Sequence, residues 1–195
     1  PDCAGEKHWI KGDFSDEEVL KEKAGIGNAK SVIILANNLD GKPKEDIDAK
    51  TILVGLTIRT IEEELKKDIY TVAELLDQKN DPHARHAHID EIIYYEDFAA
   101  KLLVMIAENK GITKIFDDLI SFDEGSEFYT EKVPPELIGK SFDEAIAFYR
   151  QKGALPIAIL RENDNVPQSQ PLINPSASEK LATDDRIVYI AKDKI

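Results

Sequence analysis

Three consecutive residues at the end of an apolar run have the position expected of a ligand-binding segment. The run covers residues 31–36, and it ends in Ala36, Asn37 and Asn38. Ligands of open α/β sheets bind outside the carboxyl ends of the strands. We therefore predict that these three residues contact a ligand or cofactor, although without a glycine-rich turn the segment alone could not hold a pyrophosphate firmly.

A second candidate is Asp13, which follows Gly12 and the strand-like residues 8–11. Its carboxylate could accept a hydrogen bond from an amino group or a ribose hydroxyl. It could equally cap the short helix that follows, together with Ser15. The residues alone leave both roles open.

Strand-like and helical segments alternate around these candidates. Apolar runs at residues 31–36, 69–74 and 90–94 are separated by helical patterns, of which the longest covers about 46–66. This alternation predicts a parallel sheet with helices on both faces. No G-x-G-x-x-G turn occurs, so we expect a partial Rossmann-like sheet whose first strands are missing. Since the single Met is Met105, we also expect an excised segment of a longer protein.

The pattern changes after the sheet. Two apolar helices are expected at 97–109 and 114–120, followed by a strand at 127–133, a helix at 142–152, a strand at 155–160, a polar loop through residue 171, and a strand at 186–191. The predicted fold class is α/β, with crossover helices between the partial sheet and a small α+β C-terminal lobe. The predicted domains are residues 1–95, 96–124 and 125–195.

Composition excludes several classes of protein. The net charge of −13 repels phosphate backbones, so nucleic acid is not an expected partner. A single cysteine cannot form an internal disulfide. The longest apolar runs are far shorter than the roughly 20 residues that a membrane helix needs.

His83, His86 and His88 could supply zinc ligands, but surface histidines without metal are the favoured interpretation.

In the order of its motifs, the chain resembles the RCK domains (regulators of potassium conductance) of prokaryotic potassium channels and the related Trk and Ktr regulatory subunits. The resembling segments are residues 8–13, 29–35, 48–59, 72–77, 90–93, 133–142, 156–161, 174–175 and 184–191. Each motif is weak alone, whereas their order over nearly the whole chain is specific.

The resemblance implies a site for NAD(H) or an adenine nucleotide in the full-length protein, beside Gly12, Asp13 and Glu74. Glu74 and Asp13 also resemble positions that some channel members use for Ca²⁺. Calcium prefers six to eight oxygen ligands, and Val72 is apolar where a companion carboxylate is expected. A structural or nucleotide-contacting Glu74 is therefore the favoured interpretation, and no metal site is predicted.

The resemblance further implies an intertwined homodimer, which an octameric ring could contain. The predicted interface comprises Phe98, Leu102, Leu103, Ile106, Ile115, Phe116, Leu119 and Ile120. The expected function is non-enzymatic: a cytosolic, ligand-sensing gating-ring domain that controls a potassium-conducting pore at the cytoplasmic face of the membrane. Two alternatives remain, a fragment of an NAD(P)-dependent dehydrogenase and a structural oligomerisation module.

Overall fold

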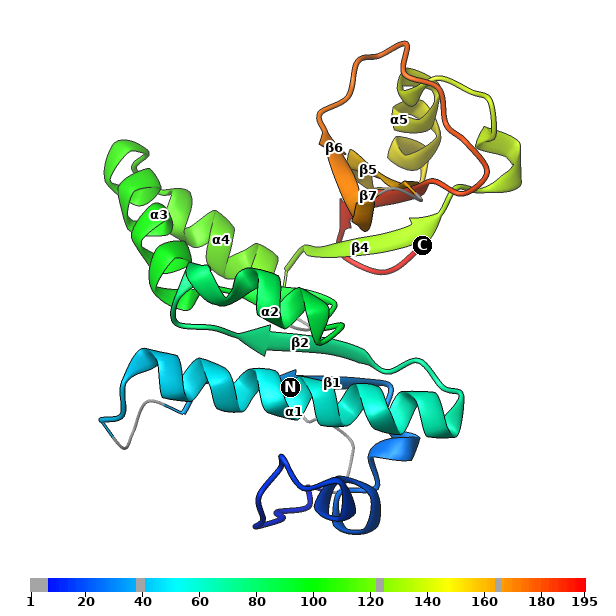
Figure 1. Cartoon of the computed structure of the whole chain (residues 1–195). Helices are drawn as coiled ribbons and strands as arrows, with labels where there is room; N and C mark the ends of the chain where they lie inside the picture. The colour runs from blue at the N-terminus through cyan, green and yellow to red at the C-terminus, as the bar shows by residue number, and fades with distance from the viewer. Residues whose placement is uncertain (1–6, 38–40, 122–124, 164–165) are drawn as a thin grey trace. The chain divides into compact units, whose positions relative to one another are not determined.

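The computed structural model describes residues 7–37, 41–121, 125–163 and 166–195. By its internal contacts the chain divides after Glu108 into an N-terminal unit, which starts at Ala4, and a C-terminal unit, which runs from Asn109 to Ile195. Each unit is described by itself below, and Figure 1 shows the course of the chain through both.

The N-terminal unit contains a three-stranded parallel sheet in the order β1-β2-β3. Its strands and helices are β1 (Ser31–Ile34), α1 (Lys44–Leu65), β2 (Tyr70–Glu74), α2 (Asp81–His86), β3 (Glu91–Ile93) and α3 (Tyr95–Glu108). A π-helical turn at Val19–Lys23 and a 3₁₀ turn at Ile26–Asn28 precede β1. The predicted partial parallel sheet is confirmed, and Figure 1 labels its strands β1 and β2.

The two faces of this sheet differ. On one face Val32 and Ile34 pack with the buried residues of α1, and Ala73 packs with Ala84 of α2. On the opposite face Ile33 is 69% exposed, and Tyr70 and Ile93 are each 48% exposed. The expectation of helices on both faces is therefore wrong for the described residues, in which only one face is covered.

The segment before the π-helical turn forms no strand. Residues 8–11 are predicted as a strand, but within the described part of the chain they join no sheet. Extended backbone becomes a strand only when a neighbour satisfies its N–H and C=O groups. β1 is the edge strand and pairs with β2 alone among the described strands, so residues 8–11 do not pair with its free edge and the prediction is wrong.

The C-terminal unit is built on an antiparallel sheet in the order β4-β7-β5-β6. Its elements are α4 (Ile112–Ile120), β4 (Glu127–Lys132), a 3₁₀ turn at Pro135–Leu137, α5 (Phe142–Gln151), β5 (Leu155–Asn163), β6 (Val166–Ile173) and β7 (Arg186–Ala191). The core includes Tyr149 and Tyr189, which are fully buried, with ring centroids 5.2 Å apart. The predicted small α+β lobe is confirmed.

One element of this lobe departs from the expectation. The segment predicted as a polar loop through residue 171 contains β6, which pairs antiparallel with β5. The polar composition and the prolines Pro167 and Pro171 argue against a central strand, but an edge strand tolerates both. Since β6 is the last strand in the order of the sheet, it occupies such an edge.

Candidate functional site

The carboxyl edge of the parallel sheet brings two predicted site residues together. Glu74 is the last residue of β2, and Ala36 lies two residues beyond β1. The backbone N–H of Ala36 donates to Oε2 of Glu74, with 3.0 Å between the two atoms. Asn37 follows Ala36 and is exposed, whereas Asn38 lies outside the described residues. The Glu74 side chain, itself a predicted site residue, therefore holds the backbone at the carboxyl edge of the sheet.

Asp13 makes a local turn contact in this structure. Its Oδ1 accepts hydrogen bonds from Ser15 N at 3.1 Å and from Ser15 Oγ at 2.8 Å. These bonds, helped by the Lys50 ammonium 3.4 Å away, hold the pKa of Asp13 below its usual value. These bonds precede the helical turn, and the bond at its start is made by Asp16, whose Oδ1 accepts from Glu18 N at 2.9 Å. Both roles that the sequence leaves open for Asp13 therefore stay predictions.

Packing explains why residue 12 is a glycine, and the sequence alone does not reveal this. A Cβ at this position would lie 2.6 Å from Cγ1 of Val19, which is closer than two carbon atoms can approach. Val19 belongs to the buried core of the unit. The small size of Gly12 is therefore required by Val19, whatever the residue also does for a ligand.

The sequence analysis missed the buried carboxylate of Asp48. This side chain of α1 is fully buried, and it accepts from Leu76 N at 2.8 Å, Asp77 N at 3.0 Å and Asn80 Nδ2 at 2.7 Å. It thereby holds the segment that follows β2. The only available signal was its place next to Ile47 on the helix, where an acidic residue also suits a helix N-terminus.

A pocket of about 320 Å³ lies beside this segment. It is lined by residues that follow β2 and β3: apolar Leu75, Leu76 and Tyr94, and polar Asp77, Gln78, Glu96 and Asp97. The Tyr94 hydroxyl donates to Asp81 Oδ1 at 2.9 Å, and burial with this carboxylate neighbour raises the pKa of Tyr94. The pocket therefore lies at the sheet edge where ligands of α/β sheets bind.

The metal hypotheses receive no support from the described residues. His83, His86 and His88 are exposed, and Nδ1 of His86 is 2.5 Å from the carbonyl oxygen of Pro82. Within residues 7–37, 41–121, 125–163 and 166–195, no group of three or more His, Cys, Asp or Glu side chains could hold a metal ion. Glu74 and Asp13 thus do not form a calcium site with other described residues.

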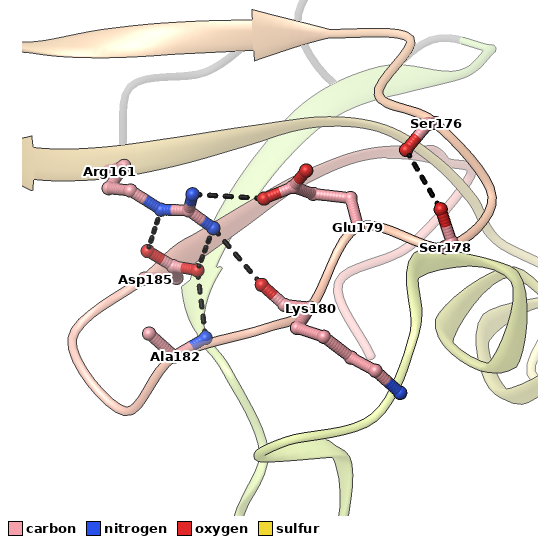
Figure 2. A network of polar contacts seen from close by, with 7 residues as sticks. All are labelled: Arg161, Ser176, Ser178, Glu179, Lys180, Ala182 and Asp185. Carbon is pink, nitrogen blue, oxygen red and sulfur yellow. Dashed lines mark hydrogen bonds and ion pairs between the residues drawn. The ribbon is translucent and has the colours of Figure 1, made fainter.

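A polar network in the C-terminal unit surrounds Arg161 of β5 (Figure 2). Its Nε and Nη2 each lie 3.0 Å from an oxygen of Asp185, and Nη1 lies 3.0 Å from Glu179 Oε1. Asp185 is 1% exposed and also accepts from Ala182 N at 2.9 Å. These carboxylates raise the pKa of Arg161. The network ties β5 to the segment before β7.

Four of the eight predicted interface residues are exposed within the chain, and the other four are half-buried. No residue of α3 or α4 is buried within the chain. The most exposed are Ile120 at 71%, Leu103 at 67%, Phe98 at 60% and Ile115 at 54%. The others are half-buried: Leu102, Ile106, Phe116 and Leu119.

Comparison with known proteins places the chain among ion-channel segments. The family model for Castor and Pollux, part of voltage-gated ion channel, matches residues 96–195, just over half of the chain. The chain belongs to this family. A second model, the TrkA-N domain, matches residues 4–95, so the two matches meet where the parallel sheet has ended and α3 has just begun.

A potassium channel agrees with this family, and the two family models together support the predicted RCK domain. Over 187 residues the chain is 26% identical to the calcium-gated potassium channel TvoK of Thermoplasma volcanium. The matched region covers 95% of the chain and 50% of the relative. The chain therefore spans about half the length of that channel.

A solved structure shares the fold. The human SLO3 gating ring matches 94% of the chain and 36% of its own length at 16% identity, with a TM-score of 0.68. The GsuK channel bound to NAD matches 98% of the chain and 30% of its own length at 21% identity, with a TM-score of 0.42. In the described part of the RCK domain no helix is both long and apolar enough to cross a bilayer.

Proposed function

We propose that this RCK domain is a ligand-sensing regulatory domain that controls potassium transport through a membrane pore, on the cytoplasmic side of the membrane. The observation that carries the proposal is the match of 95% of the chain to a potassium channel. Ligand sensing is supported by the sheet edge with its pocket, and assembly by the uncovered residues of α3 and α4.

We propose the division into domains that the sequence predicts. Residues 1–95 form the N-lobe, residues 96–124 the dimerisation helices and residues 125–195 the C-terminal lobe. The two apolar helices pack against a second copy, because large apolar surfaces exposed to water favour association. This homodimer can be the unit of a larger ring.

The ligand of the sheet edge is proposed to be an adenine nucleotide, contacted by Asn37 and by residues around Glu74. Calcium, which the name of the Thermoplasma channel includes, is not assigned to these residues because the described carboxylates do not converge on one point. A binding module fits the residues better than a dehydrogenase, because all four histidines precede residue 89 and none can serve as an acid or base in the C-terminal lobe.

The test is rubidium flux through liposomes that contain the complete protein, with and without NAD, AMP and Ca²⁺. We expect the flux to change with at least one effector while potassium-over-sodium selectivity stays constant, because selectivity is set in the pore filter. The controls are protein-free liposomes and an assay for dehydrogenase turnover. Flux that ignores every effector, or measurable turnover of NAD, would contradict the proposal.

A further inference from the structure

The antiparallel sheet of the C-terminal unit has two apolar faces. On one face Ile159, Ile187 and Tyr189 pack in the core with Tyr149 of α5. Residues directly opposite each other in neighbouring strands point to the same side of a sheet. The strand register therefore assigns three rows of residues to the other face, named the outer face here: Phe128, Ile190 and Leu155; Thr130, Val188, Ala158 and Ile173; and Lys132, Arg186, Leu160 and Pro171.

The outer face lacks the cover that α5 gives to the core face. Of the apolar residues in its three rows, all of which the structure describes, only Ala158 is buried. Ile173 is 72% exposed and Phe128 is 46% exposed, while Val188 and Ile190 are half-buried. Such a face is suited to packing against an apolar partner.

The charges that the structure describes on this face are all positive. Lys132 and Arg186 lie side by side at one end, and Lys192 follows directly after β7 at the other end. All three are exposed, and none forms an ion pair with another described residue. In a chain of net charge −13, this face favours an acidic partner. Arg186 and Lys192 are six residues apart, about 20 Å along an extended strand.

Helix α3 has the complementary pattern. Asp97 lies in its first turn and Glu108 is its last residue, with exposed apolar side chains such as Leu103 and Val104 between them. The two carboxylates are eleven residues apart, about 17 Å along a helix, which is close to the separation of the basic ends. Asp97 also pairs with Lys101, but a carboxylate has about four acceptor positions and can accept from a second cation.

Other occupants fit the outer face less well. Two outer faces packed on each other would bring two sets of basic residues into one interface, with no described carboxylate on either face to separate them. A phosphate-rich surface, whether lipid or nucleic acid, would be repelled by the large negative charge of the rest of the chain.

We propose that the outer face of the C-terminal sheet binds helix α3 of a second copy of this chain. The apolar side chains of the helix cover the middle row of the face, and its terminal carboxylates lie near the basic ends. This inference deepens the proposed homodimer and rests on it.

Cross-linking of the 195-residue chain tests the contact. The single cysteine is first replaced by Cys3→Ser, and Leu103→Cys and Thr130→Cys are then made as separate variants. After subunit exchange, a bismaleimide with a short spacer should give covalent dimers in the mixture and none with either variant alone. The control mixture pairs Leu103→Cys with Ala147→Cys, an exposed position on α5, and should stay uncross-linked.

Charge reversal tests the ends of the contact. Glu108→Lys should weaken self-association roughly five-fold by sedimentation, the size of one surface ion pair, although it lowers the net negative charge. Adding Arg186→Glu or Lys192→Glu, whichever lies near Glu108, should restore the affinity. Arg150→Glu at the exposed end of α5 makes the same charge change elsewhere and should restore nothing. Circular dichroism confirms that each variant is folded.

Covalent dimers of Leu103→Cys alone or of Thr130→Cys alone would mean helix-on-helix or sheet-on-sheet packing and would overturn the inference, while the proposed homodimer would stand. An intrachain cross-link in a chain that carries both cysteines, or failure of both charge reversals to restore affinity, would also overturn it. A wild-type chain that stays monomeric would instead contradict the homodimer itself.

Discussion

Glu74 and Ala36 join the carboxyl ends of two neighbouring strands, since the Glu74 carboxylate accepts the backbone N–H of Ala36 at 3.0 Å. A side chain predicted to contact a ligand thus also shapes the backbone around it. Replacing Glu74 by Ala should accelerate amide hydrogen exchange at Ala36 roughly five-fold, because one hydrogen bond contributes about 1 kcal/mol. Exchange measured by NMR checks this.

The control for this variant is Asp68→Ala, which removes an exposed carboxylate before the opposite end of β2. It should leave exchange at Ala36 unchanged. Equal acceleration in both variants would mean that charge, and not the hydrogen bond, sets the rate.

Asp48 should be essential for the segment after β2. Asp48→Ala leaves the N–H groups of Leu76 and Asp77 without their acceptor, which should lower the free energy of unfolding by about 2 to 3 kcal/mol. Asp46→Ala, on the exposed side of the same helix, should cost less than about 1 kcal/mol. Urea denaturation compares the two, and similar losses would contradict the role of Asp48.

The Arg161 network should stabilise the C-terminal unit. Arg161→Met leaves the carboxylate of Asp185, which is 1% exposed, without its guanidinium partner. We expect a loss of roughly 2 to 3 kcal/mol, less than for a fully buried pair because Arg161 is partly exposed. Arg150→Met at the exposed end of α5 is the control, measured by thermal unfolding. A stability equal to that of the wild type would rule out this role.

Acid should weaken the start of α5. Hydrogen bonds from the backbone and side chain of Ser141, together with Lys140, lower the pKa of Glu144 from 4.5 to about 2. A carboxyl with a depressed folded-state pKa stabilises the protein above its unfolded value, and this contribution is lost as the pH falls from 4.5 toward 2. The stability difference between wild type and Glu144→Ala should therefore shrink over this interval.

Melting temperatures between pH 7 and pH 2 test the direction. Glu136→Ala, which removes an exposed carboxylate from the preceding turn, serves as the control and should show no comparable pH dependence. A difference for Glu144→Ala that grows toward low pH would refute the assignment.

The predicted oligomer depends on α3. Leu103→Glu places a charge in the proposed apolar interface, so sedimentation at micromolar concentration should shift from a dimer or larger species toward the 21.9 kDa monomer. Because Leu103 is 67% exposed within the chain, the fold should survive. Lys101→Glu on the same helix is the control. A wild-type chain that sediments only as a monomer would contradict the prediction.

The sequence by itself determined the order of elements and the kind of fold. Hydrophobic periodicity is a local property, so the α1 pattern and the alternation of the β7 strand predicted their elements within about two residues. The apolar faces of α3 and α4 could also be predicted, because the spacing of apolar residues along a helix alone decides whether they share one face.

Only the tertiary structure decided which groups meet. Asp48 and Leu76 are 28 residues apart, and Arg161 and Asp185 are 24 apart, so nothing local in the sequence could pair them. The same limit explains the errors. Whether residues 8–11 form a strand and whether residues 166–173 form a loop both depend on neighbours that the chain supplies from elsewhere.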